Sequence, residues 1–334
     1  MTDVPHSHRS PGNAPSTADL RPPGAQPRPS RWGRWLRWIA GSLLVVMLIA
    51  RLTVQDRLPF FSTLFYAAPL PVLTALAAGL VLASGRSRRA CVTWSLVSGV
   101  LCLWTLAEYR RSVPPATLER PIRLLLWNTG RGTIGSPDGI AREITRVDAD
   151  LVVLIEAVPW EDPPEIRAFW KEACPQYRTS LLGGGIVLLS KFPSGETTTA
   201  ELPLSTRTRQ LDIDCDGTPL RLLVCDVGSN PFRSRKPTLD AITAAADKLA
   251  DSPALVLGDF NTPHDSRCFD GLRTSYRNAF LTAGSGYLAT WPIPLPVLSL
   301  DQIWASDRIT LGTCRHLWTT RSDHRPVLLE FDLK

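Results

Sequence analysis

Three long apolar stretches follow one another in the first third of this 334-residue chain, and they restrict its fold more than any other feature. They cover about residues 38–54, 60–83 and 90–107, and the last two contain no charged residue. A helix needs about 20 apolar residues to cross a bilayer, and lipid offers no hydrogen-bond partners to an irregular backbone. The sequence therefore predicts a membrane anchor over residues 31–112 with three transmembrane helices. The first is the shortest, and its Arg51 must extend toward the lipid headgroups.

Two other interpretations of these stretches are weaker. A signal peptide would account for the first stretch alone, but that stretch lies too far from Met1 and lacks a small-residue cleavage site before the second. Three buried helices of a soluble protein would account for all three, but three such uncharged segments in series are unusual outside membranes.

The arginines orient the anchor. The net charge of +6 comes from residues 1–120, which hold 14 arginines and no lysine against five acidic residues, whereas the rest of the chain is mildly acidic. This distribution gives no support for a polyanion-binding surface on the larger part. Arginines gather before the first stretch and between the second and third: Arg28, Arg31, Arg34, Arg37, Arg86, Arg88 and Arg89. The positive-inside rule places these segments in the cytoplasm. Three crossings then predict a multi-pass protein of the cell membrane, with everything after Tyr109 on the extracytoplasmic side.

The remaining segments differ in composition. Residues 1–30, rich in Pro, Ser, Gly and Arg, predict a disordered tail, and residues 113–120 predict a proline-containing linker. Seven cysteines without a CxxC spacing indicate neither a zinc site nor a disulfide framework. Residues 121–334 alternate strand and helix patterns, which predicts a mixed sheet or a pair of sheets flanked by helices. The strands are expected at 122–128, 151–156, 184–190, 211–215, 220–226, 255–259, 300–304 and 326–331, and the helices at 137–147 and 237–250.

Polar residues stand where several of these apolar strands begin or end. In Leu255-Val256-Leu257-Gly258-Asp259-Phe260-Asn261-Thr262-Pro263 an apolar run stops at a carboxylate and a carboxamide, although an ordinary turn would also explain that segment by itself. Several carboxylates on one sheet edge favour a shared hard divalent cation, and a histidine among them adds a group that titrates near neutral pH. The other polar residues at strand ends are Asn128, Glu156, Asp226 and the run Ser322-Asp323-His324-Arg325-Pro326.

These segments, taken in order, resemble the endonuclease/exonuclease/phosphatase superfamily, whose fold is DNase I-like. The most specific matches are Gly258-Asp259-Phe260-Asn261 and Ser322-Asp323-His324-Arg325-Pro326, followed by Asp301-Gln302-Ile303-Trp304 and Trp127-Asn128. The resemblance covers 121–334 and implies a four-layered α/β/β/α sandwich that hydrolyses a phosphate ester with Mg²⁺, or with Mn²⁺ in its place. Together with the anchor, the chain resembles a membrane-attached bacterial branch of that superfamily.

The resemblance also implies roles for single residues. Glu156 is expected to bind the metal, Asn128 to help hold metal or phosphate, and Asp323 to supply a carboxylate near the metal. Asp259 is expected to orient or deprotonate the attacking water, and Asn261 to contact the phosphate. Asp301 would orient His324, which would act as a base or stabilise the phosphate. The sequence leaves open which of Asp259 and His324 is the base.

Two positions depart from the family pattern. Asp226 stands where relatives carry a histidine or tyrosine that touches the phosphate, and Ile155 stands where the metal-binding glutamate is often preceded by Gln. Asp226 is expected to contact substrate, add a metal ligand or weaken catalysis.

Weaker candidates lie in the expected loops. Trp291 is predicted to pack beneath the substrate or stack on it, and Arg207 to grip a phosphate unless its loop is simply solvated. The same two alternatives hold for Arg209. Arg233, Arg235 and Lys236 stand near the expected site edge, where solvent exposure is favoured over a phosphate contact. A turn or surface position is expected for His264 and His316.

The function that these patterns favour is hydrolysis of a phosphodiester or phosphomonoester, in nucleic acid or in a lipid or small-molecule headgroup, by a membrane-anchored domain. A catalytically weakened domain that serves as a binding or scaffold module is the alternative, motivated by Asp226. A transporter or channel is disfavoured because two of the three apolar stretches carry no charge. The lipid bilayer is the expected partner of the anchor, and the oligomeric state stays open.

Overall fold

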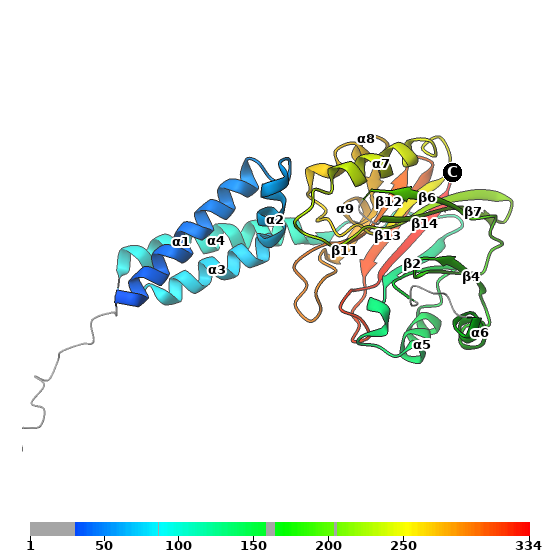
Figure 1. Cartoon of the computed structure of the whole chain (residues 1–334), viewed down its shortest axis with the longest axis horizontal. Helices are drawn as coiled ribbons and strands as arrows, with labels where there is room; N and C mark the ends of the chain where they lie inside the picture. Colours follow the sequence, from blue (N-terminus) through cyan, green and yellow to red (C-terminus); the bar gives the residue numbers. More distant parts are fainter. Residues whose placement is uncertain (1–30, 86, 158–163, 204–205) are drawn as a thin grey trace, which may run out of the picture.

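The computed structural model describes residues 31–85, 87–157, 164–203 and 206–334, so the predicted tail 1–30 lies outside the described residues. A bundle of helices extends from one side of a compact α/β domain (Figure 1). The bundle contains α1 (Arg31–Leu52), α3 (Leu70–Ala83) and α4 (Arg88–Tyr109), and the short helix α2 (Pro59–Ala67) lies between the bundle and the domain.

Two helices of the bundle, α1 and α4, are long and apolar enough to cross a membrane. The predicted continuous helix 60–83 is wrong, because α2 and α3 meet at an angle of 69°. Pro69 and Pro71 cause this break, since neither can donate a backbone N–H to a preceding turn. The described chain thus has two candidate spans, or three if the bent pair counts as one.

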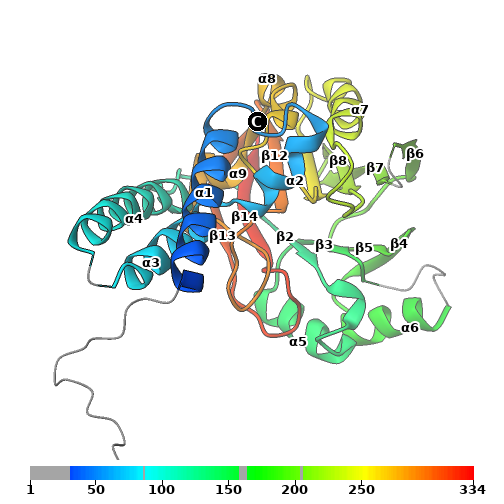
Figure 2. The ribbon, with the colours of Figure 1, turned by 60° about the vertical axis from the view of Figure 1, so that its left-hand side comes forward.

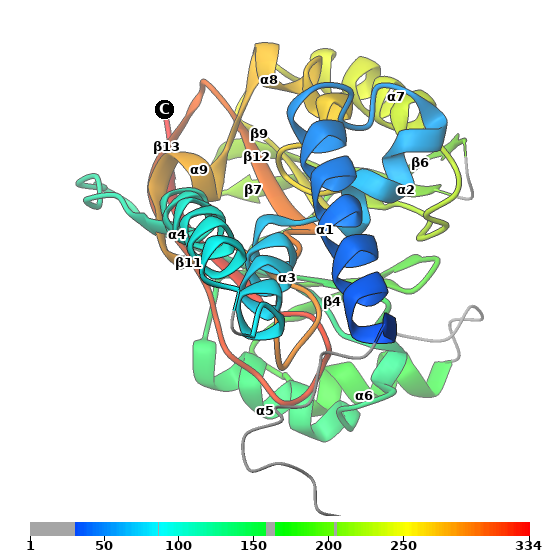
Figure 3. The same ribbon diagram turned by 90° about the vertical axis from the view of Figure 1, so that its left-hand side faces the viewer.

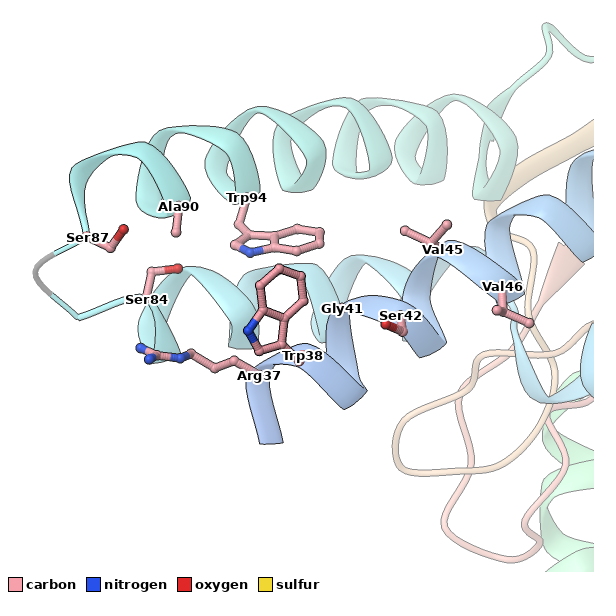
Figure 4. Close-up of a pocket in the computed structure, with 10 residues that line it drawn as sticks. All are labelled: Arg37, Trp38, Gly41, Ser42, Val45, Val46, Ser84, Ser87, Ala90 and Trp94. Carbon is pink, nitrogen blue, oxygen red and sulfur yellow. The ribbon is translucent and has the colours of Figure 1, made fainter. Parts of the chain in front are cut away.

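The helices leave grooves between them at the end of the bundle remote from the domain. Trp38 of α1 and Trp94 of α4 line an apolar groove of about 570 Å³ there (Figure 4). A Cβ on Gly41 would lie only 3.1 Å from the indole of Trp94, so the glycine allows α1 to approach this ring.

The domain is built on two sheets. The first has the order β1-β11-β13-β14-β2-β3-β5-β4, with β1 Arg110–Ser112, β11 Gly284–Tyr287, β13 Ile309–His316, β14 Val327–Leu333, β2 Ile122–Asn128, β3 Leu151–Ile155, β5 Ile186–Ser190 and β4 Arg178–Gly183. The second has the order β10-β12-β9-β8-β7-β6, with β10 Tyr276–Asn278, β12 Asp301–Ser306, β9 Ala254–Asp259, β8 Thr218–Asp226, β7 Thr206–Cys215 and β6 Thr198–Leu202. Most neighbouring strands are antiparallel, but β2 with β3, β8 with β9 and β11 with β13 run parallel.

The alternation of side chains along these strands creates one core between the sheets and one on each outer face. Leu124 and Leu126 of β2 face Leu255 and Leu257 of β9 in the central core. Their neighbours Leu125 and Trp127 point the other way, toward α5 (Pro137–Val147) and α6 (Pro164–Ala173). On the far side, Val256 packs with α7 (Lys236–Asp247) and with the segment that holds α8 (Leu272–Ser275). Figures 2 and 3 show these layers. The predicted four-layered sandwich is confirmed.

Two details differ from the expected domain plan. Arg110–Ser112, assigned to the end of the anchor, pairs with β11 as the edge strand of the first sheet, directly after α4. Arg207 and Arg209, expected in a loop, lie in β7. A short helix, α9 (Ala279–Ala283), packs between the two sheets next to β11 and β13.

Candidate active site

The ends of four central strands meet at one edge of the sandwich. Asp259 ends β9 and lies opposite Asp301, which begins the antiparallel strand β12. Asn128 ends β2 of the other sheet, and Glu156 follows β3, its parallel neighbour. A hydrogen bond of 2.9 Å from Nδ2 of Asn128 to Oδ2 of Asp259 joins the two sheets at this edge. Residues that are far apart in sequence therefore converge because the register of the strands brings their ends together.

Asp259 is buried and held from both sides. Its Oδ2 accepts from Asn128, and its Oδ1 accepts from the backbone N–H of Asn261 at 2.8 Å. Burial and the neighbouring carboxylate of Asp301 raise the pKa of Asp259 to about 7. A carboxyl group with a pKa near neutrality is suited to accept a proton during a reaction.

Asp301 and His324 form a buried pair. Nδ1 of His324 lies 2.8 Å from Oδ2 of Asp301, which fixes the orientation of the ring. Burial lowers the pKa of His324, but Asp301 and Asp259 outweigh it and raise that pKa to about 10. The imidazole is therefore a cation at neutral pH, with Nδ1 committed to Asp301 and Nε2 left for another partner.

The backbone is strained at two residues that follow the ends of β3 and β9 at this edge. Glu156 and Asn261 have φ angles of +52° and +46°, in the left-handed region that residues with a Cβ seldom adopt. Asn261 tolerates this conformation better than Glu156 does, and its Nδ2 donates to the carbonyl oxygen of Val227 at 2.7 Å. Strain of this kind persists where the surrounding structure holds a side chain in a required position.

Glu156 pairs with an arginine that the sequence pattern did not single out. Nη2 of Arg131 lies 2.8 Å from Oε1 of Glu156, and both side chains are partly exposed. Asp323 accepts a hydrogen bond of 3.0 Å from Nε1 of Trp291, whose ring centre lies 6.4 Å from that of His324. Trp291 thus contacts this edge of the sandwich from the side.

These side chains surround a cleft of about 400 Å³. Its lining includes most of the predicted site residues, but neither Asp301 nor Asp323, which support it from behind. Two further polar lining residues stand out: Tyr66, which comes from helix α2 and was not predicted, and Arg235, for which solvent exposure was favoured over a phosphate contact. The residues that line the cleft are Tyr66, Asn128, Glu156, Ser229, Pro231, Arg235, Asp259, Asn261, Pro263, Trp291, Leu298, Leu300 and His324.

Arg235 corrects one expectation of solvent exposure. Its side chain is buried, donates from Nη1 to the carbonyl oxygen of Asn230 at 2.8 Å and lies 3.3 Å from that of Asn261. Lys236, the next residue, is exposed as expected and pairs with Asp240. No periodicity in the sequence distinguishes the two, because a short irregular segment precedes α7.

Asp226 and Arg207 meet each other rather than the cleft. They are register partners on β8 and β7, and Nη1 of Arg207 lies 2.7 Å from Oδ2 of Asp226. Burial raises the pKa of Asp226 to about 6 although Arg207 opposes the shift. Neither residue belongs to the cleft lining within the described parts of the chain.

His264 and His316 are both buried, which corrects the expected surface positions. His264 lies in a turn, as one alternative had it, and its Nε2 lies 3.0 Å from Oε1 of Glu108 on α4. His316 ends β13 and stacks on Phe280 at a ring distance of 4.1 Å. No local pattern marks either histidine as buried.

The loop that follows the active-site strand is tied to the anchor at several points. Besides the contact between His264 and Glu108, Arg51 of α1 pairs with Asp265. Asp56, between α1 and α2, accepts from the hydroxyl of Ser266 and, at 3.0 Å, from the backbone N–H of Arg267. Arg51 was expected to reach the headgroups, and it instead binds the domain. The anchor therefore helps hold the segment that begins at Asn261.

The oxygen donors at this edge fit a divalent cation. Ligand atoms of Asp259, Asp301 and His324 lie within 4.8 Å of one another, and Oδ1 of buried Asp301 has no hydrogen-bond partner among the described residues. Nδ1 of His324 and Oδ2 of Asp301 are taken up by their mutual hydrogen bond, which suits this trio to proton transfer. Glu156 and Asn128 bring further oxygen atoms to the same cleft, where Oε1 of Glu156 pairs with Arg131 and Oδ1 of Asn128 accepts from the backbone N–H of Gly130 at 2.9 Å.

Comparisons with known proteins agree with this geometry. Residues 125–324 match the model of the Endonuclease/Exonuclease/phosphatase family. An endonuclease/exonuclease/phosphatase from Bacteroides vulgatus matches with a TM-score of 0.51 at 17% identity, over 65% of this chain and 100% of that chain. A mannosyl-6-phosphatase from Bacteroides thetaiotaomicron matches with a TM-score of 0.51 at 15% identity, over 64% and 100%. TDP2 from D. rerio, complexed with a single-strand DNA product, gives 0.52 at 13%, over 64% and 100%.

At these identities the structural matches establish the fold alone. No curated protein matches the sequence of the chain.

Proposed function

Because the chain belongs to the endonuclease/exonuclease/phosphatase family, we propose that it is a membrane-anchored phosphoesterase that uses Mg²⁺, or Mn²⁺ in its place, to hydrolyse a phosphate ester with water. The observation that carries this proposal is the convergence of Asp259, Asp301 and His324, within 4.8 Å, at a cleft that also receives Glu156 and Asn128. Hydrolysis of such an ester needs a positioned water, a proton acceptor and positive charge near the phosphate oxygens.

Glu156 and Asn128 would hold the metal ion, with Asp323 nearby. When bound, the ion would neutralise charge on the non-bridging oxygens of the phosphate. The role of Glu156 is supported by its left-handed backbone and by its position after β3, which aim a carboxylate into the cleft.

The two buried groups with shifted pKa values divide the proton chemistry. Asp259, with its pKa near 7, accepts the proton of the attacking water, and Asn128 and Asn261 hold its carboxylate in place. His324, cationic beside Asp301, uses Nε2 to stabilise the phosphate or to protonate the leaving oxygen. These charges support Asp259 as the base and His324 as the acid.

A second candidate, a non-catalytic binding module, is favoured by Asp226 alone. This residue stands where the family resemblance leads us to expect a phosphate contact, but it is neutralised by Arg207 outside the cleft. The complete set of Asp259, Asn261, Asp301 and His324 argues for turnover over binding.

The placement of the arginines supports a cytoplasmic N-terminus and an extracytoplasmic catalytic domain. Protease added to intact cells should therefore remove the domain, and complete protection of the domain would contradict this topology.

Turnover of simple esters tests the chemistry. The full chain in detergent is assayed with bis(p-nitrophenyl) phosphate and p-nitrophenyl phosphate, in Mg²⁺ or Mn²⁺ and with EDTA. We expect turnover that EDTA abolishes and that Asp259→Ala and His324→Ala each reduce by about 10²-fold or more. Asp240→Ala, which removes an exposed carboxylate on α7, is the matched control and should retain activity. Absence of turnover with both metals would contradict the proposal. Site variants that hydrolyse the esters as fast as the wild type would contradict it as well.

A further inference from the structure

One wall of the catalytic cleft comes from the membrane anchor. Tyr66 of α2 lines the cleft together with Pro231, and Oγ1 of Thr63 donates to the carbonyl oxygen of Pro231 at 2.7 Å, which holds α2 against the loop between β8 and α7. Because α2 turns 69° away from α3, it lies across the direction of the candidate spans at their domain end. The cleft therefore opens at the level where lipid headgroups meet water.

The composition of α2 suits that level. Its nine residues, Pro59–Ala67, include four aromatic side chains and no charge. Aromatic residues favour the boundary between hydrocarbon and water, where their rings lie among the headgroups. Phe65 and Tyr66 are buried in the protein, and Phe61, 37% exposed, is the ring that this helix can present to the headgroups.

Two loops that line the cleft carry exposed apolar side chains. Phe232, next to Pro231, is 79% exposed, and Leu295, in the loop from Trp291 to Leu298, is 78% exposed. They are the most exposed of the large apolar side chains in the described part of the catalytic domain. Figure 1 shows the Trp291–Leu298 loop, in orange, on the side of the domain that faces the helices. A bilayer surface would cover such side chains, which water does not favour.

The net charge of the domain argues against a nucleic-acid substrate. Residues 121–334 hold 18 arginines and 5 lysines against 26 acidic residues, so the domain has no excess of cations with which to bind a nucleic-acid backbone. Within the cleft, however, Arg235 and His324 are basic side chains that line the space for a single phosphate. A soluble ester would need neither a wall from the anchor nor an apolar rim.

We propose that the substrate of this phosphoesterase is a lipid phosphoester held in the bilayer, an inference that rests on the function proposed above. The headgroup enters the cleft beside Tyr66, between the loops that carry Phe232 and Leu295, while the hydrocarbon chains stay in the membrane. The oxygen of water bonds to phosphorus, the ester P–O bond breaks, Asp259 takes a proton from the water, and His324 protonates the oxygen that leaves. The products are an alcohol and a phosphate-bearing fragment, and one of them stays in the membrane.

The test compares one reaction in two settings. The full chain, in mixed micelles of detergent and phosphatidylcholine, is given phosphatidylglycerol or phosphatidic acid. The water-soluble counterparts are glycerophosphoglycerol and glycerol phosphate, with bis(p-nitrophenyl) phosphate as the basal ester and single-stranded DNA as a competitor. The double variant Phe232→Ser/Leu295→Ser removes the apolar loop tips outside the cleft lining. Its matched control, Phe232→Trp/Leu295→Met, keeps them apolar.

We expect the lipid to be hydrolysed in preference to its soluble counterpart. The serine variant should lose about tenfold or more in kcat/KM for the lipid, the control variant should not, and both should keep the basal ester activity. Preference for the soluble ester or for DNA, or a serine variant equal to the wild type on lipid, would overturn the lipid assignment and leave the phosphoesterase function standing. Hydrolysis of no phosphoester at all would remove both.

Discussion

Replacement of Gly258 by alanine tests how closely the two central strands of the second sheet must approach. Gly258, directly before Asp259, has a φ angle of +146° and pairs with Cys225 of β8. A Cβ at this position would lie 1.8 Å from the carbonyl oxygen of Cys225, where ordinary contact begins at 3.4 Å. In Gly258→Ala, β8 and β9 must therefore move apart by more than an ångström, and Asp259 must move with them.

The size of the effect follows from this displacement. Separation of the strands breaks about two ladder hydrogen bonds, each worth roughly 1 kcal/mol, and the φ angle adds roughly 1–3 kcal/mol of strain. We expect a loss of roughly 3–5 kcal/mol in the free energy of unfolding and a fall of roughly 10 °C or more in Tm. The kcat for a phosphoester should fall as well, because the carboxylate of Asp259 leaves its position between Asn128 and Asn261.

Thermal unfolding of the full chain in detergent, followed by tryptophan fluorescence, measures this loss. Gly217→Ala is the matched control, because Gly217 has a φ angle of +88° but nothing within 4 Å of a Cβ. It should therefore show backbone strain alone, about 1 kcal/mol. If the two variants unfold at the same temperature, the close approach of β8 and β9 is not what requires glycine at position 258.

Three further predictions concern buried charges. Asp301→Asn should lower kcat by roughly 10²–10⁴-fold. Because Asp301 raises the pKa of His324, the variant should also move the basic limb of the pH–rate profile to lower pH. A basic limb that stays at the same pH would contradict this cause. Arg51→Met leaves Asp265 without its partner and should cost about 2–3 kcal/mol in thermal unfolding, whereas Arg51→Met/Asp265→Leu should recover most of it; a stable single variant would refute the coupling. Burial lowers the pKa of His316 to about 3. Below about pH 6.5 the unfolded chain therefore binds a proton on this ring that the folded chain does not. The free energy of unfolding should then fall by about 1.4 kcal/mol per pH unit from pH 6.5 toward 3. His316→Phe should remove that part of the slope in denaturant unfolding at pH 7 and pH 5, and an unchanged slope would count against it.

Much of the fold and of the site could be predicted because it depends on patterns within short segments of the sequence. An apolar run that stops at a polar residue, such as Leu255–Asp259, indicates both a buried strand and a group at its end. The strand that carries Asn128 and the one that leads to Glu156 follow the same rule. The break at Pro69 could also have been predicted, because proline interrupts a helix, but the hydropathy of residues 60–83 by itself does not indicate it.

The remaining features depend on register and on long-range packing. Arg207 meets Asp226 because β7 and β8 pair in one particular register, and a shift by one residue would turn Arg207 to the other face. His264 is buried because Glu108, 156 positions earlier, reaches it from the anchor. Tyr66 lies in an apolar stretch and carries no sign of a site.

The contacts between anchor and domain decide what the functional unit is. Similarity to the family covers residues 125–324, and the sequence pattern likewise begins the domain near residue 121. A domain cut there would lose the edge strand Arg110–Ser112, the Tyr66 wall of the cleft, and every anchor contact to the loop after Asn261. The carboxylate of Asp265 would lose Arg51, and the buried ring of His264 would lose Glu108. Unpaired polar groups of this kind are costly, and they would lie in the segment that follows β9 directly. The helices of residues 31–109 therefore help to form the candidate site, and the whole chain is the unit whose activity should be measured.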